Sequence, residues 1–223
     1  MSIPSPVMSK KIVVFGMGYV GIPAAALFAD IKDFNVVGIQ RRSKRSGWKI
    51  DYLNEGKNPI GGDEPGLSDL IKRVVDKKTF RVTDDVSECS NSDVILIDVQ
   101  TPTDEQGIPH YDSLKAVSKQ IGKYMKKGVL VVIESTVAPG TTENIVKPIL
   151  EEESKLQAGI DFSLVFSYER VMVGRLIKNI VYLPRIVGGI DDESTRRGVD
   201  LYKNIVISIV NRMRVVRLLY ESA

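Results

Sequence analysis

The chain has 223 residues, a formal net charge of +3, 43% hydrophobic residues and 26% charged residues. This composition excludes wholesale disorder, and the small, dispersed positive charge gives no reason to expect a nucleic-acid partner. The single cysteine, Cys89, excludes an internal disulfide and suits a reducing compartment, so we expect a cytoplasmic protein. No apolar run is long enough for a signal peptide or a membrane-spanning helix, so we expect no membrane partner.

Short apolar, β-branched runs alternate with longer segments of helical period, a pattern typical of strand–helix units around a parallel sheet. The expected strands span residues 11–15, 35–39, 80–82, 94–99, 129–134 and 162–166. The expected helices span residues 19–31, 67–76, 111–124 and 141–154. The sequence therefore predicts an α/β fold with a doubly wound parallel sheet over residues 11–205. We expect a disordered N-terminus at residues 1–10 and an atypical tail at residues 206–223.

The first expected strand runs directly into GMGYVG, in which Gly16, Gly18 and Gly21 have the G-x-G-x-x-G spacing. In a dinucleotide-binding unit the first glycine makes the turn, the second lets the pyrophosphate approach the backbone, and the third allows close helix packing. The N-terminus of the following helix faces the phosphates. The strand before and the helix after the motif favour this reading over an ordinary strand–helix turn, which is the alternative. The sequence thus predicts a Rossmann-like dinucleotide-binding domain.

The second expected strand ends near Gln40, where a NAD-binding unit normally places Asp or Glu on the ribose 2′-OH. The next residues are Arg41, Arg42, Ser43 and Lys44. Guanidinium groups at this place suit a 2′-phosphate, so the local chemistry favours NADP. The alternative is a solvated loop in which Gln40 serves the ribose of NAD as an amide.

Polar side chains also follow three later strands of the expected sheet. They are Thr101 and Thr103 in VQTPTD, Ser135 and Thr136 in IESTVAPGTTE, and Glu169 and Arg170 in SYERVMVG. Taken singly, each segment is typical of a turn with capping hydroxyls. Their repetition at the carboxyl ends of successive strands instead indicates a ligand site, because open α/β sheets bind ligands at that edge.

Six segments, in this order, resemble the UDP-glucose/GDP-mannose dehydrogenase family, the nucleotide-sugar 6-dehydrogenases. They are GMGYVGIP, PIGGDEPGL, VQTPTD, ESTVAPGTTE, YERVMVG and RIVGG. The resemblance covers roughly residues 11–205 and is greatest to the branch that oxidises UDP-N-acetylmannosamine or UDP-N-acetylglucosamine. It implies oxidation of the C6 alcohol of a UDP-sugar to a carboxylate by two hydride transfers to NAD, through a cysteine thioester. Full-length members of this family form homodimers.

The resemblance also implies roles for particular residues. The pyrophosphate would be held by Gly16, Gly18, Tyr19, Val20 and Gly21. The nicotinamide would lie near Thr101 and Thr136. From the residues themselves, we also expect Thr103 and Ser135 at the cofactor site and Gln40, Arg41 and Arg42 near the ribose. Catalysis would involve Glu169 and Thr136, and the substrate cleft would be lined by Glu169 and Arg170.

The chain departs from the family pattern at Tyr168 and Val173, where the family has proline, and residues 206–223 match none of its later segments. We therefore expect the cofactor-binding half of the enzyme, without the catalytic cysteine and lysine and inactive alone. Cys89 is expected to be a structural thiol and His110 to have no catalytic role, and we expect no metal. The alternatives are a non-catalytic NAD(P)-binding module and an enzyme similar to 3-hydroxyacid dehydrogenases.

Overall fold

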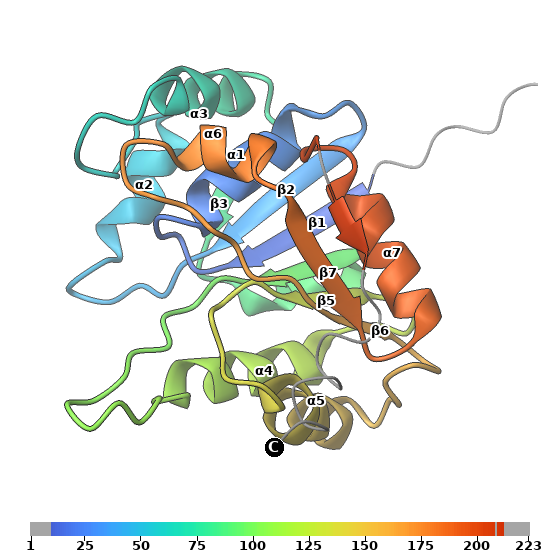
Figure 1. Cartoon of the computed structure of the whole chain (residues 1–223). Helices are drawn as coiled ribbons and strands as arrows, with labels where there is room; N and C mark the ends of the chain where they lie inside the picture. Colours follow the sequence, from blue (N-terminus) through green and yellow to red (C-terminus); the bar gives the residue numbers. More distant parts are fainter. Residues whose placement is uncertain (1–9, 208, 212–223) are drawn as a thin grey trace, which may run out of the picture.

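The computed structural model describes residues 10–207 and 209–211, and its centre is an eight-stranded sheet of order β3-β2-β1-β4-β5-β6-β7-β8 (Figure 1). The strands are β1 (Lys10–Phe15), β2 (Phe34–Ile39), β3 (Phe80–Thr83), β4 (Val94–Ile97), β5 (Leu130–Ile133), β6 (Ser163–Phe166), β7 (Arg185–Gly189) and β8 (Ile209–Asn211). Neighbours from β3 to β6 are parallel, β7 is antiparallel to β6, and β8 is parallel to β7. This confirms the doubly wound fold. The strand order reverses between β1 and β4, and open α/β sheets bind ligands at the carboxyl ends of the strands beside such a reversal.

Helices cover both faces of the sheet (Figure 1). They are α1 (Gly21–Asp30), α2 (Trp48–Asn54), α3 (Leu67–Asp76), α4 (Asp112–Tyr124), α5 (Lys147–Ser154), α6 (Leu176–Tyr182) and α7 (Asp192–Tyr202). One buried cluster joins the sheet to α1, α2, α3, α6 and α7, and a second joins it to α4 and α5. Strands covered on both faces need apolar side chains at every position, which explains the uninterrupted apolar runs of β4 and β5.

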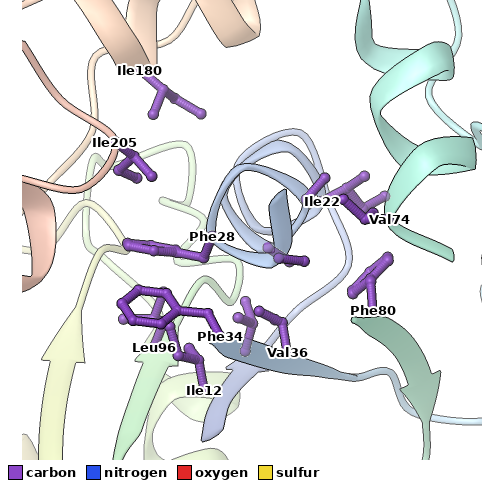
Figure 2. Packing of buried hydrophobic residues seen from close by; sticks show 14 of the residues in the cluster. Ile12, Ile22, Phe28, Phe34, Val36, Val74, Phe80, Leu96, Ile180 and Ile205 are labelled. Carbon is purple, nitrogen blue, oxygen red and sulfur yellow. The ribbon is translucent and has the colours of Figure 1, made fainter. Parts of the chain in front are cut away.

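The helix α1 packs closely on the sheet because its buried face is rich in alanine. Figure 2 shows Phe28 of α1 beside Phe34 of β2, and their ring centroids are 6.3 Å apart. Ile12 and Leu96, from the neighbouring strands β1 and β4, are fully buried in the same cluster. This packing holds the C-terminal part of α1 on the sheet.

Two expected boundaries are wrong by more than one residue, and one expected helix is divided. The helix expected at 19–31 begins at Gly21, because the preceding residues form the glycine turn. The strand expected at 94–99 ends at Ile97, although the N–H of Asp98 still donates to Phe15 O at 2.8 Å. The helix expected at 141–154 is divided into a π-helical turn, Thr142–Val146, and α5. Pro148 has no N–H to donate, which interrupts the hydrogen-bond ladder there.

Several short elements were not expected from the sequence. They are α2, a 3₁₀ helix at Val86–Asn91, α6, β7, α7 and β8. Part of the expected tail, Ile209–Asn211, pairs with β7 and extends the sheet. The expected disorder at residues 1–9 lies outside the described residues, whereas Lys10 already begins β1.

Candidate functional site

The glycine turn between β1 and α1 is held tightly at both ends. Gly16 has a φ of +101°, and an added Cβ would overlap the carbonyl oxygen of Asp98. A Cβ on Gly21 would overlap the carbonyl oxygen of Gly16. Both positions therefore require glycine for the fold itself, as the motif predicts for the turn and the close packing of the helix.

Gly18 lies between them and differs from both. An added Cβ at Gly18 would meet nothing within 4 Å, and its φ is not in the left-handed region. The fold alone therefore does not require glycine there. Val20, the N-cap of α1, makes no side-chain capping hydrogen bond, and the neighbouring Tyr19 is 49% exposed. Backbone N–H groups at an uncapped helix N-terminus are donors of the kind that bind phosphate groups.

The end of β2 is bonded to the glycine turn. Gln40 Oε1 accepts the N–H of Met17 at 3.3 Å, and Gln40 Nε2 donates to Ser46 Oγ at 2.9 Å. The amide of Gln40 is thus occupied by the protein on both sides. Its place beside the turn agrees with the expected position of the ribose-recognising residue, but its hydrogen bonds hold the loop.

Arg41 and Arg42 are both exposed at this edge. The Arg42 guanidinium lies 3.4 Å from Asp84 and 3.7 Å from Asp51, two exposed carboxylates. Exposed pairs of this kind are weak, so a phosphate can compete for the guanidinium. The competition nevertheless reduces what Arg42 would contribute to binding a 2′-phosphate.

Lys49, in the first turn of α2, was missed by the sequence reasoning. Its Nζ donates to the carbonyl oxygen of Met17 at 2.9 Å, in the middle of the glycine turn. Partial burial lowers the pKa of its ammonium group. The ammonium group therefore lies beside the glycine turn. Nothing in the sequence marks Lys49 until a helix is placed at Trp48–Asn54.

The hydroxyl groups after β4 and β5 join these two strand ends together. Ser135 Oγ donates to Val99 O at 2.7 Å, and Thr101 Oγ1 donates to Thr136 O at 2.7 Å. Ser135 is buried, whereas Thr136 and Thr103 are exposed. The structure therefore brings these segments together as expected, with Ser135 and Thr101 engaged by the backbone and Thr136 open at the edge.

The loop after β6 carries Glu169 and Arg170. Glu169 is partly buried and accepts the N–H of Val171 at 2.6 Å, and burial raises the pKa of its carboxyl group. Arg170 donates to the carbonyl oxygen of Pro184. Glu64, from the connection between α2 and α3, anchors this loop by accepting the N–H groups of Gly174 and Leu176. The segment PIGGDEPGL thus positions the loop that carries Glu169.

Behind the open edge lies a buried ionic cluster that the sequence reasoning also missed. Arg185 of β7 forms an ion pair with Glu134, which follows β5, and both side chains are at least 95% buried. Arg185 also donates to Ser167 Oγ at 2.9 Å and lies over the ring of Tyr202, whose Oη donates to Glu134 at 2.7 Å. Burial raises the pKa of the Tyr202 hydroxyl well above its ordinary value, so Tyr202 remains a neutral donor.

Cys89 and His110 lie in different surroundings, one buried and one exposed. Cys89 is fully buried, and burial raises the pKa of its thiol to about 12. His110 is exposed and bonded to Asp104 of its own loop at 3.1 Å. Within residues 10–207 and 209–211, no group of three His, Cys, Asp or Glu is placed to hold a metal ion. No helix in the described part of the chain is long and apolar enough to cross a bilayer.

Residues 10–206 match the model of the UDP-glucose/GDP-mannose dehydrogenase family, NAD binding domain. UDP-N-acetyl-D-mannosamine dehydrogenase of Pyrococcus horikoshii is 36% identical over 196 residues, covering 88% of this chain and 45% of that protein. GDP-mannose 6-dehydrogenase of Azotobacter vinelandii is 34% identical over 207 residues, covering 91% and 46% respectively. The chain therefore spans about half the length of the curated relatives it matches.

Solved structures agree with these matches. NDP-N-acetyl-D-galactosaminuronic acid dehydrogenase of Methanosarcina mazei has a TM-score of 0.88 and 50% identity, covering 92% of this chain and 44% of that chain. UDP-D-ManNAc dehydrogenase of Pyrococcus horikoshii has a TM-score of 0.83 and 36% identity, covering 90% and 46%. The resemblance carried by the six sequence segments is confirmed.

Proposed function

Because this chain belongs to the UDP-glucose/GDP-mannose dehydrogenase family, we propose that its glycine turn binds the pyrophosphate of NAD at the switch point of the sheet. The observation that carries the proposal is the open space at Gly18 between two glycines that the fold itself requires. At the N-terminus of a helix, a glycine in open space with an ordinary φ lets a phosphate approach the backbone closely. Lys49 adds a positive charge to the same turn.

The activity proposed for the whole protein is oxidation of the C6 alcohol of a UDP-hexose or UDP-N-acetylhexosamine to a carboxylate. The name of one relative, UDP-N-acetyl-D-mannosamine dehydrogenase, supports the UDP-sugar, and that of another, GDP-mannose 6-dehydrogenase, supports oxidation at C6 of a nucleotide sugar. When bound, NAD supplies the hydride acceptor. Glu169 has the partial burial and raised pKa of a group that holds and releases a proton beside a substrate. Arg170 and Tyr168, on either side of it, would contact the sugar nucleotide. The single cysteine suits the reducing cytoplasm as the location.

We predict that this chain alone binds cofactor but does not oxidise a UDP-sugar. Thioester formation needs an accessible thiolate, and Cys89 is fully buried with its thiol pKa raised to about 12. The measurement is the appearance of reduced nicotinamide absorbance with UDP-N-acetylmannosamine, compared between the parent chain and Cys89→Ser. Reduction by the parent that Cys89→Ser abolishes would make Cys89 the nucleophile and contradict the prediction. A non-catalytic module would also bind cofactor without turnover. Recombination with a relative's C-terminal half distinguishes such a module from the cofactor-binding half of an enzyme.

The choice between NAD and NADP depends on the residues after β2. No carboxylate is present at Gln40 to accept from a ribose 2′-OH, and Arg41 and Arg42 are exposed at the same edge. A charge-assisted hydrogen bond from one guanidinium to phosphate contributes about 1.5–3 kcal/mol when fully formed. We therefore propose that NADP binds at least as tightly as NAD.

The test is calorimetric titration of both cofactors into the parent and into Arg41→Ala with Arg42→Ala. We expect the double substitution to weaken NADP by roughly tenfold and NAD by less than about twofold. The matched control is Arg196→Ala, an exposed arginine on α7 that is paired with Glu193. Clear NAD preference in the parent, or equal losses for both cofactors, would show that the arginines are a solvated loop.

A further inference from the structure

A row of polar side chains crosses the sheet just beyond the ends of β4, β5 and β6. Asp98 follows β4, Glu134 follows β5 and Ser167 follows β6. The parallel registers of these strands bring the three residues level with one another. By strand alternation they point to the face that α1 and α7 cover, because Leu96 and Val132, two residues earlier, belong to that cluster.

This row holds three buried oxygen atoms without a hydrogen-bond partner in the described part of the chain. They are both carboxylate oxygens of Asp98 and Oε2 of Glu134. The other oxygen of Glu134 already accepts from Arg185 and Tyr202. Two buried carboxylates beside one guanidinium leave an excess negative charge, which is costly in a site closed to water. One proton between Asp98 and Glu134 Oε2 removes the excess charge and gives Oε2 a donor.

The charged neighbours of Asp98 favour that proton. Burial raises the pKa of Asp98 well above its ordinary value, and the adjacent Glu134 raises it further. Arg185 of β7 acts in the opposite direction, and Glu169, in the loop after β6, acts in the same direction as Glu134. Tyr202 of α7 contributes a neutral hydroxyl group, which already donates a hydrogen bond to Glu134. From α1, the group that approaches Asp98 is the backbone of Gly21.

Asp98 also lies directly behind the glycine turn. Its carbonyl oxygen closes the space beside Gly16, and its Cβ lies 3.3 Å from the point where a Cβ on Gly21 would stand. An ionised carboxylate at this place would repel an anion bound on the other side of the turn. A neutral carboxylic acid fills the same volume without that repulsion.

We propose that Asp98 and Glu134 share one proton, and that the neutral Asp98 is a positioning residue that supports Gly16 and Gly21 without opposing the pyrophosphate. The role toward the cofactor rests on the proposed function, whereas the shared proton does not. The carboxyl pair is therefore tested on the protein without cofactor, and its effect on binding is tested separately.

The first test compares the parent with Asp98→Asn, which keeps the shape and can donate an N–H to Glu134 Oε2. The stability that the protonated acid contributes is fully present below the ordinary Asp pKa of about 3.9 and is lost as pH rises through the raised pKa. We therefore compare the two proteins by one ratio, the unfolding constant of the parent divided by that of the variant. This ratio should rise by up to about tenfold per pH unit above about pH 5, and it should level off once the pH exceeds the raised pKa of Asp98. A ratio that does not change with pH would overturn the shared proton.

The matched control is Asp33→Asn, at an exposed position before β2 whose φ of 66° asparagine tolerates. The pH dependence of the Asp98→Asn ratio is compared with that of the Asp33→Asn ratio. If this control shows the same slope as Asp98→Asn, the slope does not report on the buried pair, and the proposal fails.

The second test measures NAD affinity by calorimetry over the same pH range. Above the pH at which the unfolding ratio levels off, the NAD affinity of the parent should be roughly three- to tenfold lower than that of Asp98→Asn. Below that pH, the two affinities should be equal. If the ratio has not levelled off by about pH 9, the two affinities should stay equal throughout. Affinities that diverge at any other pH would overturn the positioning role. No binding by either protein would instead overturn the proposed function and leave the proton measurement standing.

Discussion

Replacing Gly18 with valine should abolish dinucleotide binding while leaving the fold intact. An added Cβ at Gly18 meets no protein atom within 4 Å and the position has no positive φ, so we expect the free energy of unfolding to change by no more than about 1 kcal/mol. The valine side chain would occupy the space through which the pyrophosphate approaches the backbone. We therefore expect the affinity for NAD to fall by at least about a hundredfold, about 2.7 kcal/mol, measured by calorimetry.

Two further glycines make this experiment specific. Gly61→Val is the matched control, because Gly61 also has open space and an ordinary φ, and its variant should bind NAD as the parent does. Gly16→Ala should lower the stability of the fold instead, since its Cβ would overlap the Asp98 backbone. A folded Gly18→Val protein with the parent's affinity would remove the glycine turn from the binding site.

Replacing Arg185 with methionine should destabilise the protein by about 3–5 kcal/mol, because Glu134 would lose its cation in a site closed to water. The double variant Arg185→Met with Glu134→Leu should lose less than the sum of the two single changes, since it leaves neither charge unpaired. Urea unfolding of the four proteins measures the coupling between the two side chains.

The exposed Arg196 provides the comparison for this buried pair. It forms an ion pair with Glu193 in which both side chains are about 60% exposed, so Arg196→Met should cost less than about 1 kcal/mol. A loss of that small size for Arg185→Met would show that the buried cluster does not hold the strand ends together.

The glycine turn and the central strands could be predicted because their signals are local. Gly16, Gly18 and Gly21 have a fixed spacing, and the strands covered on both faces are continuous apolar runs. Five of the six expected strands are correct to within one residue at each end, and the helix expected at 67–76 is correct at both. Even so, the different environments of the three glycines became visible only in three dimensions.

The far edge of the sheet could not be predicted in the same way. β7 is short, ends in two glycines and is stabilised by neighbours distant in the sequence. The first two turns of α7 are polar, with Val199, Leu201 and Tyr202 the large apolar residues that it buries. Helical period is weak in such a segment because much of the helix faces solvent.

The buried cluster was missed for a related reason. An arginine at the start of a strand reads as a solvent-facing residue, and its partners Glu134 and Tyr202 are 51 and 17 residues away in the sequence. Asp98 was placed inside an expected strand, so nothing marked it as a group facing a second carboxylate. Lys49 escaped notice because α2 was not expected. Each of these residues acquires its role from tertiary contacts alone.

The most direct measurement of the central claim is a calorimetric titration of NAD into this chain, with the Gly18→Val protein measured in parallel. We predict saturable binding of one NAD per chain for the parent and no detectable binding for Gly18→Val, with both proteins folded by circular dichroism. A folded parent chain that binds neither NAD nor NADP would contradict the account.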